Sequence, residues 1–196
     1  MKYMSLQEIA AACGGTYYGG SEFLPREVSS VVIDSRKAEK EQSVYRDPGG
    51  TRRRTFLYSE SNGTRSALRR FRRRSRRCSY LILKVASCEQ ALKDIAEHYR
   101  RSLDIKVVGI SGSVGKTSTK EMIASVLSQK YSVLKTEGNF NNEIGLPLTV
   151  FNLRKEHEIA VLEMGISGFE EMTRLAKVAR PDICVLTNIG VAHMEI

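Results

Sequence analysis

From residue 106 onward, short apolar runs alternate with amphipathic stretches of helical length. The apolar runs cover residues 107–110, 133–134, 159–162 and 183–186, and helical patterns cover residues 117–129 and 169–179. Strands that alternate with helices in this way form a parallel sheet covered by helices. The sequence therefore predicts an α/β fold whose ligands bind at the carboxyl ends of the strands.

The first of these strands leads into a glycine-containing loop, which reads Ser-Gly-Ser-Val-Gly-Lys-Thr over residues 111–117. In such a loop the backbone N–H groups turn toward a phosphate, the lysine neutralises phosphate charge and the threonine hydroxyl is a magnesium ligand. The strict pattern has glycine at position 110, where this chain has Ile110 and places Gly109 one residue earlier. We interpret the segment as a variant phosphate loop that binds ATP and Mg²⁺. Its binding residues are Gly112, Ser113, Val114, Gly115, Lys116, Thr117 and Ser118.

Other polar residues follow the later strands. Glu163 ends an apolar run, where an unpaired carboxylate is costly and a metal ion would neutralise it, although a strand-end acid in a salt bridge fits the same pattern. Amide side chains that can orient a substrate or metal-bound water are those of Asn139, Asn141, Asn142 and Asn188. The same residues are common in plain turns, and both interpretations stay open for Asn139 and Asn142.

The N-terminal part has a weaker pattern. Ser5 and Glu8 have the spacing of a capping box, which predicts a short first helix that ends before two glycines. Residues 31–33 and 80–83 read as strands, and Ser87 can cap a helix over residues 88–101. We therefore expect a small α/β domain ahead of the parallel sheet.

Five ordered motifs resemble those of the Mur ligases and their folylpolyglutamate synthetase relatives. They are the phosphate loop, T-E-G-N-F-N-N-E-I-G-L-P-L-T at 136–149, L-E-M-G-I-S-G at 162–168, T-N-I-G-V-A-H at 187–193 and D-S-R at 34–36. The resemblance covers residues 1–40 and 80–196. It implies a UDP-binding-type α/β domain over residues 1–86, disrupted at 41–79, followed by an incomplete P-loop central domain over residues 87–196.

The resemblance also implies a reaction. Mur ligases transfer the γ-phosphoryl group of ATP to a carboxylate, and an amine then displaces phosphate from the acyl phosphate, so cations and backbone donors dominate catalysis. The most similar member adds D-alanyl-D-alanine to UDP-N-acetylmuramoyl-tripeptide in peptidoglycan synthesis. The implied catalytic residues are Lys116, Glu163 and His193, and the implied metal ligands are Thr117, Glu163 and His193. The implied substrate-binding residues are Ser35, Arg36, Asn139, Asn142 and Asn188.

One segment departs from this family pattern. The whole chain has 31 Lys+Arg and 22 Asp+Glu, a net charge of +9, but residues 46–77 alone hold 12 Arg and two acids. The other residues are therefore close to neutral, and the segment has too few apolar residues to complete a half-domain. We expect no family-like strands between residues 41 and 79.

Two explanations of this segment stay open. It is an arginine-rich arm for nucleic acid, or a stretch translated in a shifted frame between two compensating shifts near Glu41 and Ser79. We favour the shifted frame, because the resemblance stops and restarts abruptly without an obvious change in spacing. Translating the coding DNA in the other two frames separates the explanations.

In the family that this sequence resembles, the chain continues beyond the position of Ile196. We therefore expect this chain to be a fragment that does not catalyse ligation alone. Two alternative functions stay open. One is a folylpolyglutamate synthetase-like ligase, which the D-S-R element at 34–36 and the N-F-N-N segment at 139–142 disfavour, and the other is a non-catalytic P-loop nucleotide binder with an arginine-rich arm. We expect a monomer that binds neither membrane nor nucleic acid.

No apolar run approaches the roughly 18 residues that cross a bilayer, and the N-terminus lacks a signal-peptide core. The four cysteines, Cys13, Cys78, Cys88 and Cys184, show no C-x-x-C spacing, which favours reduced thiols in a cytoplasmic protein. Cys184 lies in an apolar run and is expected in the core.

Overall fold

The computed structural model describes residues 4–28, 30–32, 42–44, 54–59 and 80–190. The chain forms two compact units, residues 1–91 and 92–196. The division falls inside α2 (Cys88–Arg101), slightly after the expected boundary between residues 86 and 87. The predicted sites at residues 34–36 and 193, and Cys78, lie outside the described residues.

The N-terminal unit is built on a five-stranded sheet in the order β1-β5-β4-β3-β2. Strands β2 and β3 are parallel, and the other neighbours are antiparallel. The elements are α1 (Leu6–Ala12), β1 (Thr16–Tyr18), the 3₁₀ helix η1 (Ser21–Phe23), β2 (Ser30–Val32), β3 (Gln42–Val44), β4 (Arg54–Ser59) and β5 (Tyr80–Val85).

Helix α1 begins with the predicted capping box. The backbone N–H of Glu8 donates to Ser5 Oγ at 3.2 Å, and the N–H of Ser5 donates to the Glu8 carboxylate at 2.7 Å. Leu6 and Ile9 are buried on one face of the helix. The local sequence is therefore sufficient to start this helix.

The expectation of no family-like strands between residues 41 and 79 is wrong for β3 and β4. Strand β4 lies between β3 and β5, and residues 54–59 pair antiparallel with residues 80–85. Backbone pairing supplies the hydrogen bonds whatever the side chains are, and β4 contains Thr, Phe and Tyr, which have high strand propensity. The segment as a whole has few apolar residues, but three of them are adjacent within β4.

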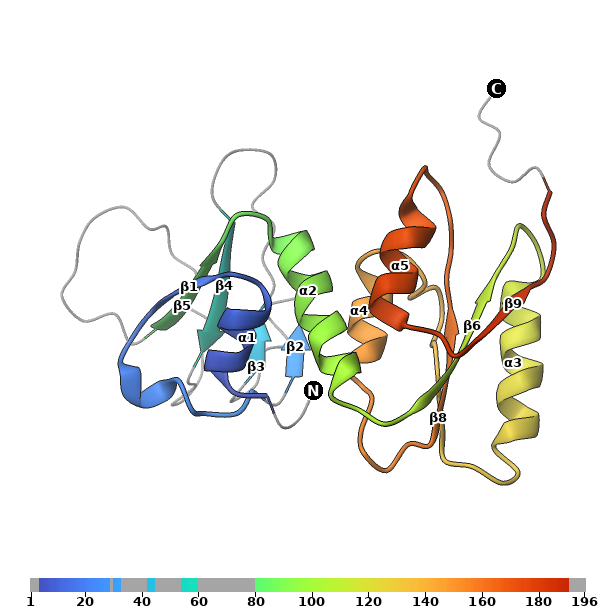
Figure 1. Ribbon diagram of the computed structural model, residues 1–196, viewed down its shortest axis with the longest axis horizontal. Coiled ribbons are helices and arrows are strands. Elements are labelled where there is room, and N and C mark those ends of the chain that lie inside the picture. Colours follow the sequence, from blue (N-terminus) through green and yellow to red (C-terminus); the bar gives the residue numbers. More distant parts are fainter. Residues whose placement is uncertain (1–3, 29, 33–41, 45–53, 60–79, 191–196) are drawn as a thin grey trace. The chain divides into compact units, whose positions relative to one another are not determined.

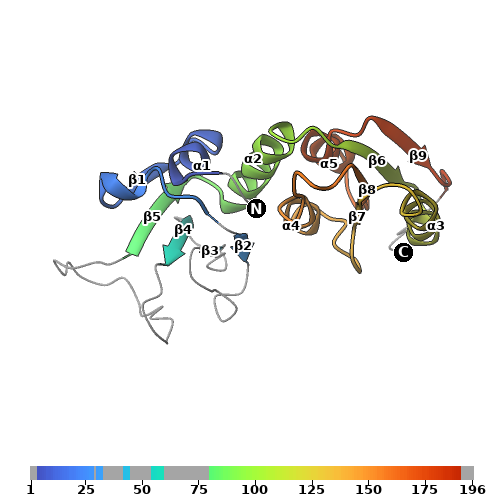
Figure 2. The ribbon, with the colours of Figure 1, turned by 90° about the horizontal axis from the view of Figure 1, so that it is seen from below.

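The C-terminal unit contains a four-stranded parallel sheet in the order β7-β8-β6-β9, which confirms the predicted fold. Figures 1 and 2 show α3 on one face of this sheet and α4 and α5 on the other. The elements are β6 (Lys106–Ser111), α3 (Lys116–Leu127), β7 (Val133–Lys135), α4 (Gly145–Val150), β8 (Ile159–Glu163), α5 (Glu171–Ala179) and β9 (Ile183–Leu186).

The core of this unit lies on both faces of β6 and β8. Under α3, Val108, Ile110 and Val161 pack with Ala124 of the helix. The C-terminal half of α2 is bound to the same unit through Tyr99, whose buried hydroxyl donates to the carbonyl oxygen of Leu153 at 2.7 Å. A buried pair of central strands thus holds the loops that follow them.

Strand β9 is the least covered strand of the described sheet. It pairs with β6 alone, and Ile183 and Leu186 expose 59% and 65% of their surface. Cys184 is also exposed, so its expected place in the core is wrong. An apolar run marks a buried strand only when both sides of the strand are covered. Among the described residues, no helix is both long and apolar enough to span a membrane.

Candidate functional site

The loop between β6 and α3 turns sharply at two glycines. Gly112 has φ +133° and Gly115 has φ +86°, in the region that only glycine adopts readily. Gly115 directly precedes the first residue of α3, Lys116. The loop and the first turn of a helix carry backbone N–H groups without intrahelical partners, which suits them to bind an anion.

Gly112 is also enclosed by the loop that follows β9. A Cβ atom at this position would lie 2.3 Å from Thr187 Oγ1 and 2.9 Å from the backbone nitrogen and oxygen of Asn188. Backbone atoms cannot move aside cheaply, so a side chain here would displace one of the two loops. The close approach therefore requires glycine.

Hydrogen bonds join these two loops directly. The backbone N–H of Ser113 donates to the carbonyl of Asn188 at 3.0 Å, and the Ser113 hydroxyl donates to the carbonyl of Gly190 at 2.7 Å. The Thr187 hydroxyl donates to the carbonyl of Val114 at 2.6 Å. Asn188 thus contributes its backbone to the phosphate loop, while its side chain remains at the exposed strand end.

Lys116 extends back over the same loop. Its Nζ donates to the carbonyl of Gly112 at 2.7 Å and lies 3.4 Å from the carbonyl of Ser113. The ammonium group is therefore held at the loop where an anion would bind. A compact positive charge in this position suits phosphate oxygens.

Thr117 and Glu163 meet across the carboxyl ends of two strands. Thr117 Oγ1 lies 3.1 Å from Oε2 and 3.3 Å from Oε1 of Glu163, whose residue surface is only 2% exposed. The Asn141 side-chain amide donates to Oε1 at 2.9 Å, and the backbone N–H of Glu163 donates to Thr136 Oγ1 at 3.0 Å. The structure thus brings together the two predicted metal ligands that it describes.

The predicted asparagines divide into different roles. Asn142 Oδ1 accepts from the backbone N–H groups of Gly145 and Ile144 at 2.8 and 3.2 Å, so its side chain supports the start of α4 as a turn residue does. Asn139 is exposed on the same loop. Asn141 is expected from the sequence to orient a substrate or metal-bound water but is not among the substrate-binding residues that the resemblance implies, and it is the one that contacts Glu163. Spacing alone does not distinguish adjacent asparagines in a turn.

An ion-pair cluster anchors this asparagine loop. Glu143 Oε2 lies 2.5 Å from Lys93 Nζ on α2, and Glu143 Oε1 pairs with Arg174 on α5. Lys93 is buried, and Glu143 is largely so. The loop that carries Asn141 is therefore fixed at its far end to two helices.

Lys120 is a buried cation of this site that the sequence interpretation missed. Its Nζ lies 3.5 Å from Glu163 Oε2 and 3.3 Å from Glu121 Oε1, and the residue is 1% exposed. Lys120 follows Lys116 by four residues, which places both lysines on one side of α3. This four-residue spacing is the feature of the sequence that indicates a second lysine near the site.

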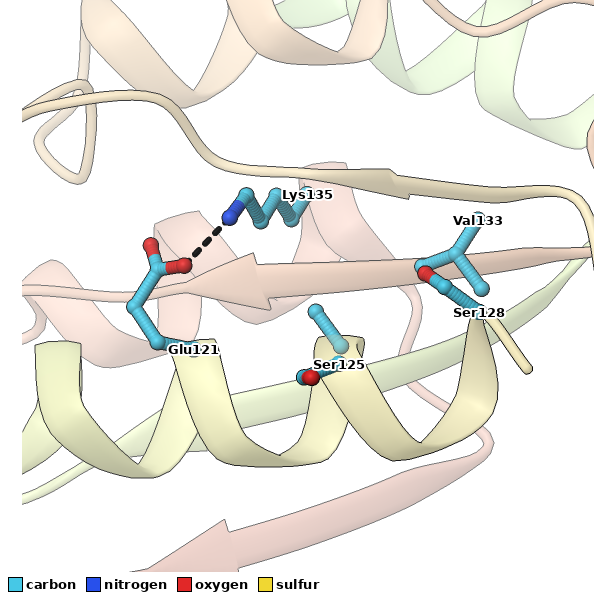
Figure 3. A pocket seen from close by; sticks show the side chains of 6 residues that line it. Glu121, Ser125, Ser128, Val133 and Lys135 are labelled. Carbon is cyan, nitrogen blue, oxygen red and sulfur yellow. Dashed lines mark hydrogen bonds and ion pairs between the residues drawn. The ribbon is translucent and has the colours of Figure 1, made fainter.

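Glu121 has a second cation on its other side. Figure 3 shows Lys135 of β7 extending toward Glu121 of α3, where the two form an ion pair. The hydrogen bond from Lys135, followed by that from Lys120, lowers the pKa of the Glu121 carboxyl below its ordinary value. The pair borders a surface pocket of about 480 Å³ lined by Glu121, Ala124, Ser125, Ser128, Val133 and Lys135.

The groups around Glu163 fit magnesium better than a softer metal. A hydroxyl and a buried carboxylate are oxygen ligands, which Mg²⁺ prefers. Within the described part of the chain, no cluster of three His, Cys, Asp or Glu residues could hold a metal by itself. The oxygen pair of Thr117 and Glu163 is therefore the candidate metal position, beside Lys116 and the phosphate loop.

The sequence and fold have known counterparts. A profile of the Mur ligase middle domain matches residues 110–196. The UDP-N-acetylmuramoyl-tripeptide–D-alanyl-D-alanine ligase of Bacillus subtilis (strain 168) is 48% identical over 117 residues, which are 60% of this chain and 26% of that protein. The enzyme of the same name from Buchnera aphidicola subsp. Acyrthosiphon pisum is 31% identical over 201 residues, covering 98% of this chain and 41% of that protein.

Solved structures agree in fold. MurF from Acinetobacter baumannii superposes with a TM-score of 0.75 at 25% identity, over 99% of this chain and 42% of that one. The MurF ligase from Thermotoga maritima in complex with ADP gives 0.54 at 45% identity, over 57% of this chain and 26% of that one. The chain thus spans less than half the length of each of these proteins.

Proposed function

Since this chain belongs to the Mur ligase family, we propose that it is part of an ATP-dependent ligase that adds D-alanyl-D-alanine to UDP-N-acetylmuramoyl-tripeptide. Relatives with that printed name support the assignment, and a MurF structure holds ADP. The chain spans 26% and 41% of the two relatives described above, so ligation is proposed for the whole protein. The part proposed for these 196 residues is binding of nucleotide and metal.

The observation that carries this proposal is the Thr117–Glu163 contact beside the loop that Lys116 covers. Phosphoryl transfer gathers negative charge, which fixed cations and backbone donors stabilise. Lys116 and the backbone N–H groups of residues 112–118 would bind the phosphates. Thr117 and Glu163 would hold Mg²⁺, with His193 as a further ligand. When bound, the metal neutralises charge on the phosphate oxygens.

The substrate residues are proposed from the family resemblance. Ser35 and Arg36 would bind the UDP part of the substrate, while Asn139 and Asn188 would orient its reacting end through neutral hydrogen bonds. Asn142 is better explained by its contact with α4. We propose a cytoplasmic monomer, as the resemblance implies.

Calorimetric titration of ADP into the purified chain, in Mg²⁺ and again in EDTA, tests the nucleotide site. We expect binding that is tighter in Mg²⁺, and absence of binding in both buffers would contradict the proposal. Ligation is measured separately as phosphate release from ATP that requires both UDP-N-acetylmuramoyl-tripeptide and D-alanyl-D-alanine. Release that requires a folate and glutamate would favour the related synthetase.

The nucleic-acid alternative has its own test. RNA or DNA binding that weakens steeply with salt, and is lost when residues 46–77 are deleted, would support an arginine-rich arm. Strand β4 falls within that range and pairs with both of its neighbours in the sheet, which disfavours a free arm.

A further inference from the structure

Lys120 is a lysine that is almost completely buried. It lies in the second turn of α3, on the side that faces β8, and only 1% of its surface is exposed. Burying an ammonium group is costly unless an opposite charge compensates for it. The position of Lys120 therefore requires an anionic partner within the protein.

That partner is the carboxylate of Glu163. Lys120 Nζ lies 3.5 Å from Glu163 Oε2, and both residues are almost fully buried. Thr117 and Asn141 also contact this carboxylate, but they are neutral. Among the described residues, Lys120 is the cation that forms an ion pair with Glu163. It therefore supplies the positive charge that a buried carboxylate needs.

The three contacts also fix the orientation of the carboxylate. Asn141 binds Oε1, Lys120 faces Oε2, and the Thr117 hydroxyl lies within 3.3 Å of both oxygens. A carboxylate held at both oxygens cannot rotate freely. Groups that orient a metal ligand in this way commonly determine metal affinity without touching the metal.

We propose that Lys120 is a positioning residue, which holds Glu163 beside Thr117 in the orientation that binds the metal. This inference rests on the proposed nucleotide and metal site. Lys120 acts through Glu163 and does not contact the nucleotide. Its second neighbour, Glu121, is shared with Lys135, so Lys120 belongs to a row of alternating charges that runs from the surface to Glu163.

The first experiment compares Lys120→Met with Lys135→Met in the full chain. Both changes remove one positive charge near Glu121, but only Lys120 contacts Glu163. ADP affinity is measured in EDTA, and the Mg²⁺ dependence is then titrated at fixed ADP. We expect Lys120→Met to weaken the apparent Mg²⁺ affinity roughly 10- to 100-fold with unchanged affinity in EDTA. Lys135→Met should alter neither value.

A purely structural role for Lys120 would lower both affinities together, and that result overturns the proposal. Unchanged or tighter Mg²⁺ affinity in Lys120→Met overturns it as well. Wild-type protein that binds ADP without any effect of Mg²⁺ would instead contradict the proposed function, so the two failures are distinguishable.

The second experiment needs no ligand. Thermal unfolding is measured for Lys120→Met, Glu163→Gln and the double variant. Removing one member of a buried ion pair leaves an uncompensated charge, whereas removing both does not. We expect the Tm of the double variant to be closer to wild type than the Tm of Lys120→Met. Additive losses of Tm would show that the two side chains are uncoupled and would overturn the proposal even if no nucleotide binds.

Discussion

The hydroxyl oxygen of Thr117 lies 3.1 Å from Oε2 of Glu163, although 46 residues separate them in sequence. Parallel pairing of β6 with β8 produces this contact, because it places Ile110 directly opposite Glu163. The chain leaves β6 just after Ile110 and returns as α3, whose second residue is Thr117. The sheet register therefore assembles the site.

Lys116→Met should weaken ADP binding roughly 10- to 100-fold, because hydrogen bonds from a charged donor are worth about 1.5–3 kcal/mol. Calorimetric titration measures the change. Lys130→Met is the control, since it removes the same charge from an exposed lysine beyond the end of α3. Equal losses in both variants would show that overall charge, and not the position of Lys116, determines the affinity.

Gly112→Ala should both destabilise the protein and abolish nucleotide binding. The new Cβ would meet Thr187 Oγ1 and the backbone of Asn188, at a φ of +133° that alanine adopts only with strain. Such strain costs about 1–3 kcal/mol. Gly168→Ala is the matched control, because a Cβ there has no atom within 4 Å. Unfolding in urea and ADP titration check both variants, and a Gly112→Ala protein with wild-type stability would refute the close approach.

Asn141→Ala and Asn142→Ala should affect different properties of the protein, the first its Mg²⁺ affinity and the second its stability. The first removes a contact to Glu163, and we expect the Mg²⁺ affinity in the presence of ADP to fall roughly 10-fold with little change in Tm. The second removes the hydrogen bonds at the start of α4, and we expect a loss of about 1 kcal/mol of stability with little change in Mg²⁺ affinity. The reverse result would assign the metal site to Asn142.

Asp182 should stabilise the fold in a pH-dependent way. The backbone N–H of Val107 donates to its carboxylate at 2.8 Å, and this bond, with help from Lys106, lowers the pKa of Asp182 below its ordinary 3.8. A lowered pKa means that the stabilisation is present above pH 3.8 and is lost as the pH falls below that value.

Asp182→Asn should therefore be less stable than wild type at pH 7. The difference in unfolding free energy should shrink as the pH approaches 3. Urea unfolding at a series of pH values measures it. A difference that stays constant down to pH 3 would show that the charge of Asp182 contributes nothing.

The periodic part of the sequence was the most predictable. The four strands of the parallel sheet and helix α2 appear where apolar spacing and Ser87 predicted them, and the backbone N–H of Gln90 donates to Ser87 Oγ. These elements are encoded locally, in the alternation of buried and exposed positions. Helix α4 was missed because Pro147 and a glycine conceal a six-residue helix that Asn142 supports from outside.

The site was predictable in its loop but not in its contacts. Lys116 and Thr117 belong to one recognisable segment. Asn141 and Lys120 acquire their roles only through Glu163, which the sheet brings to them from a distant part of the chain. The spacing of residues in the sequence gives no indication of these contacts with Glu163, apart from the four-residue interval between the two lysines of α3.

The exposure of Cys184 affects how the protein must be handled. A surface thiol on β9 is open to oxidation and to thiol-reactive dyes, whereas Cys88 is buried. Purified material stored without a reducing agent should slowly accumulate disulfide-linked dimers. The same thiol offers a labelling position on the strand that leads into the loop around Gly112, so a fluorophore there could report when a ligand enters the site.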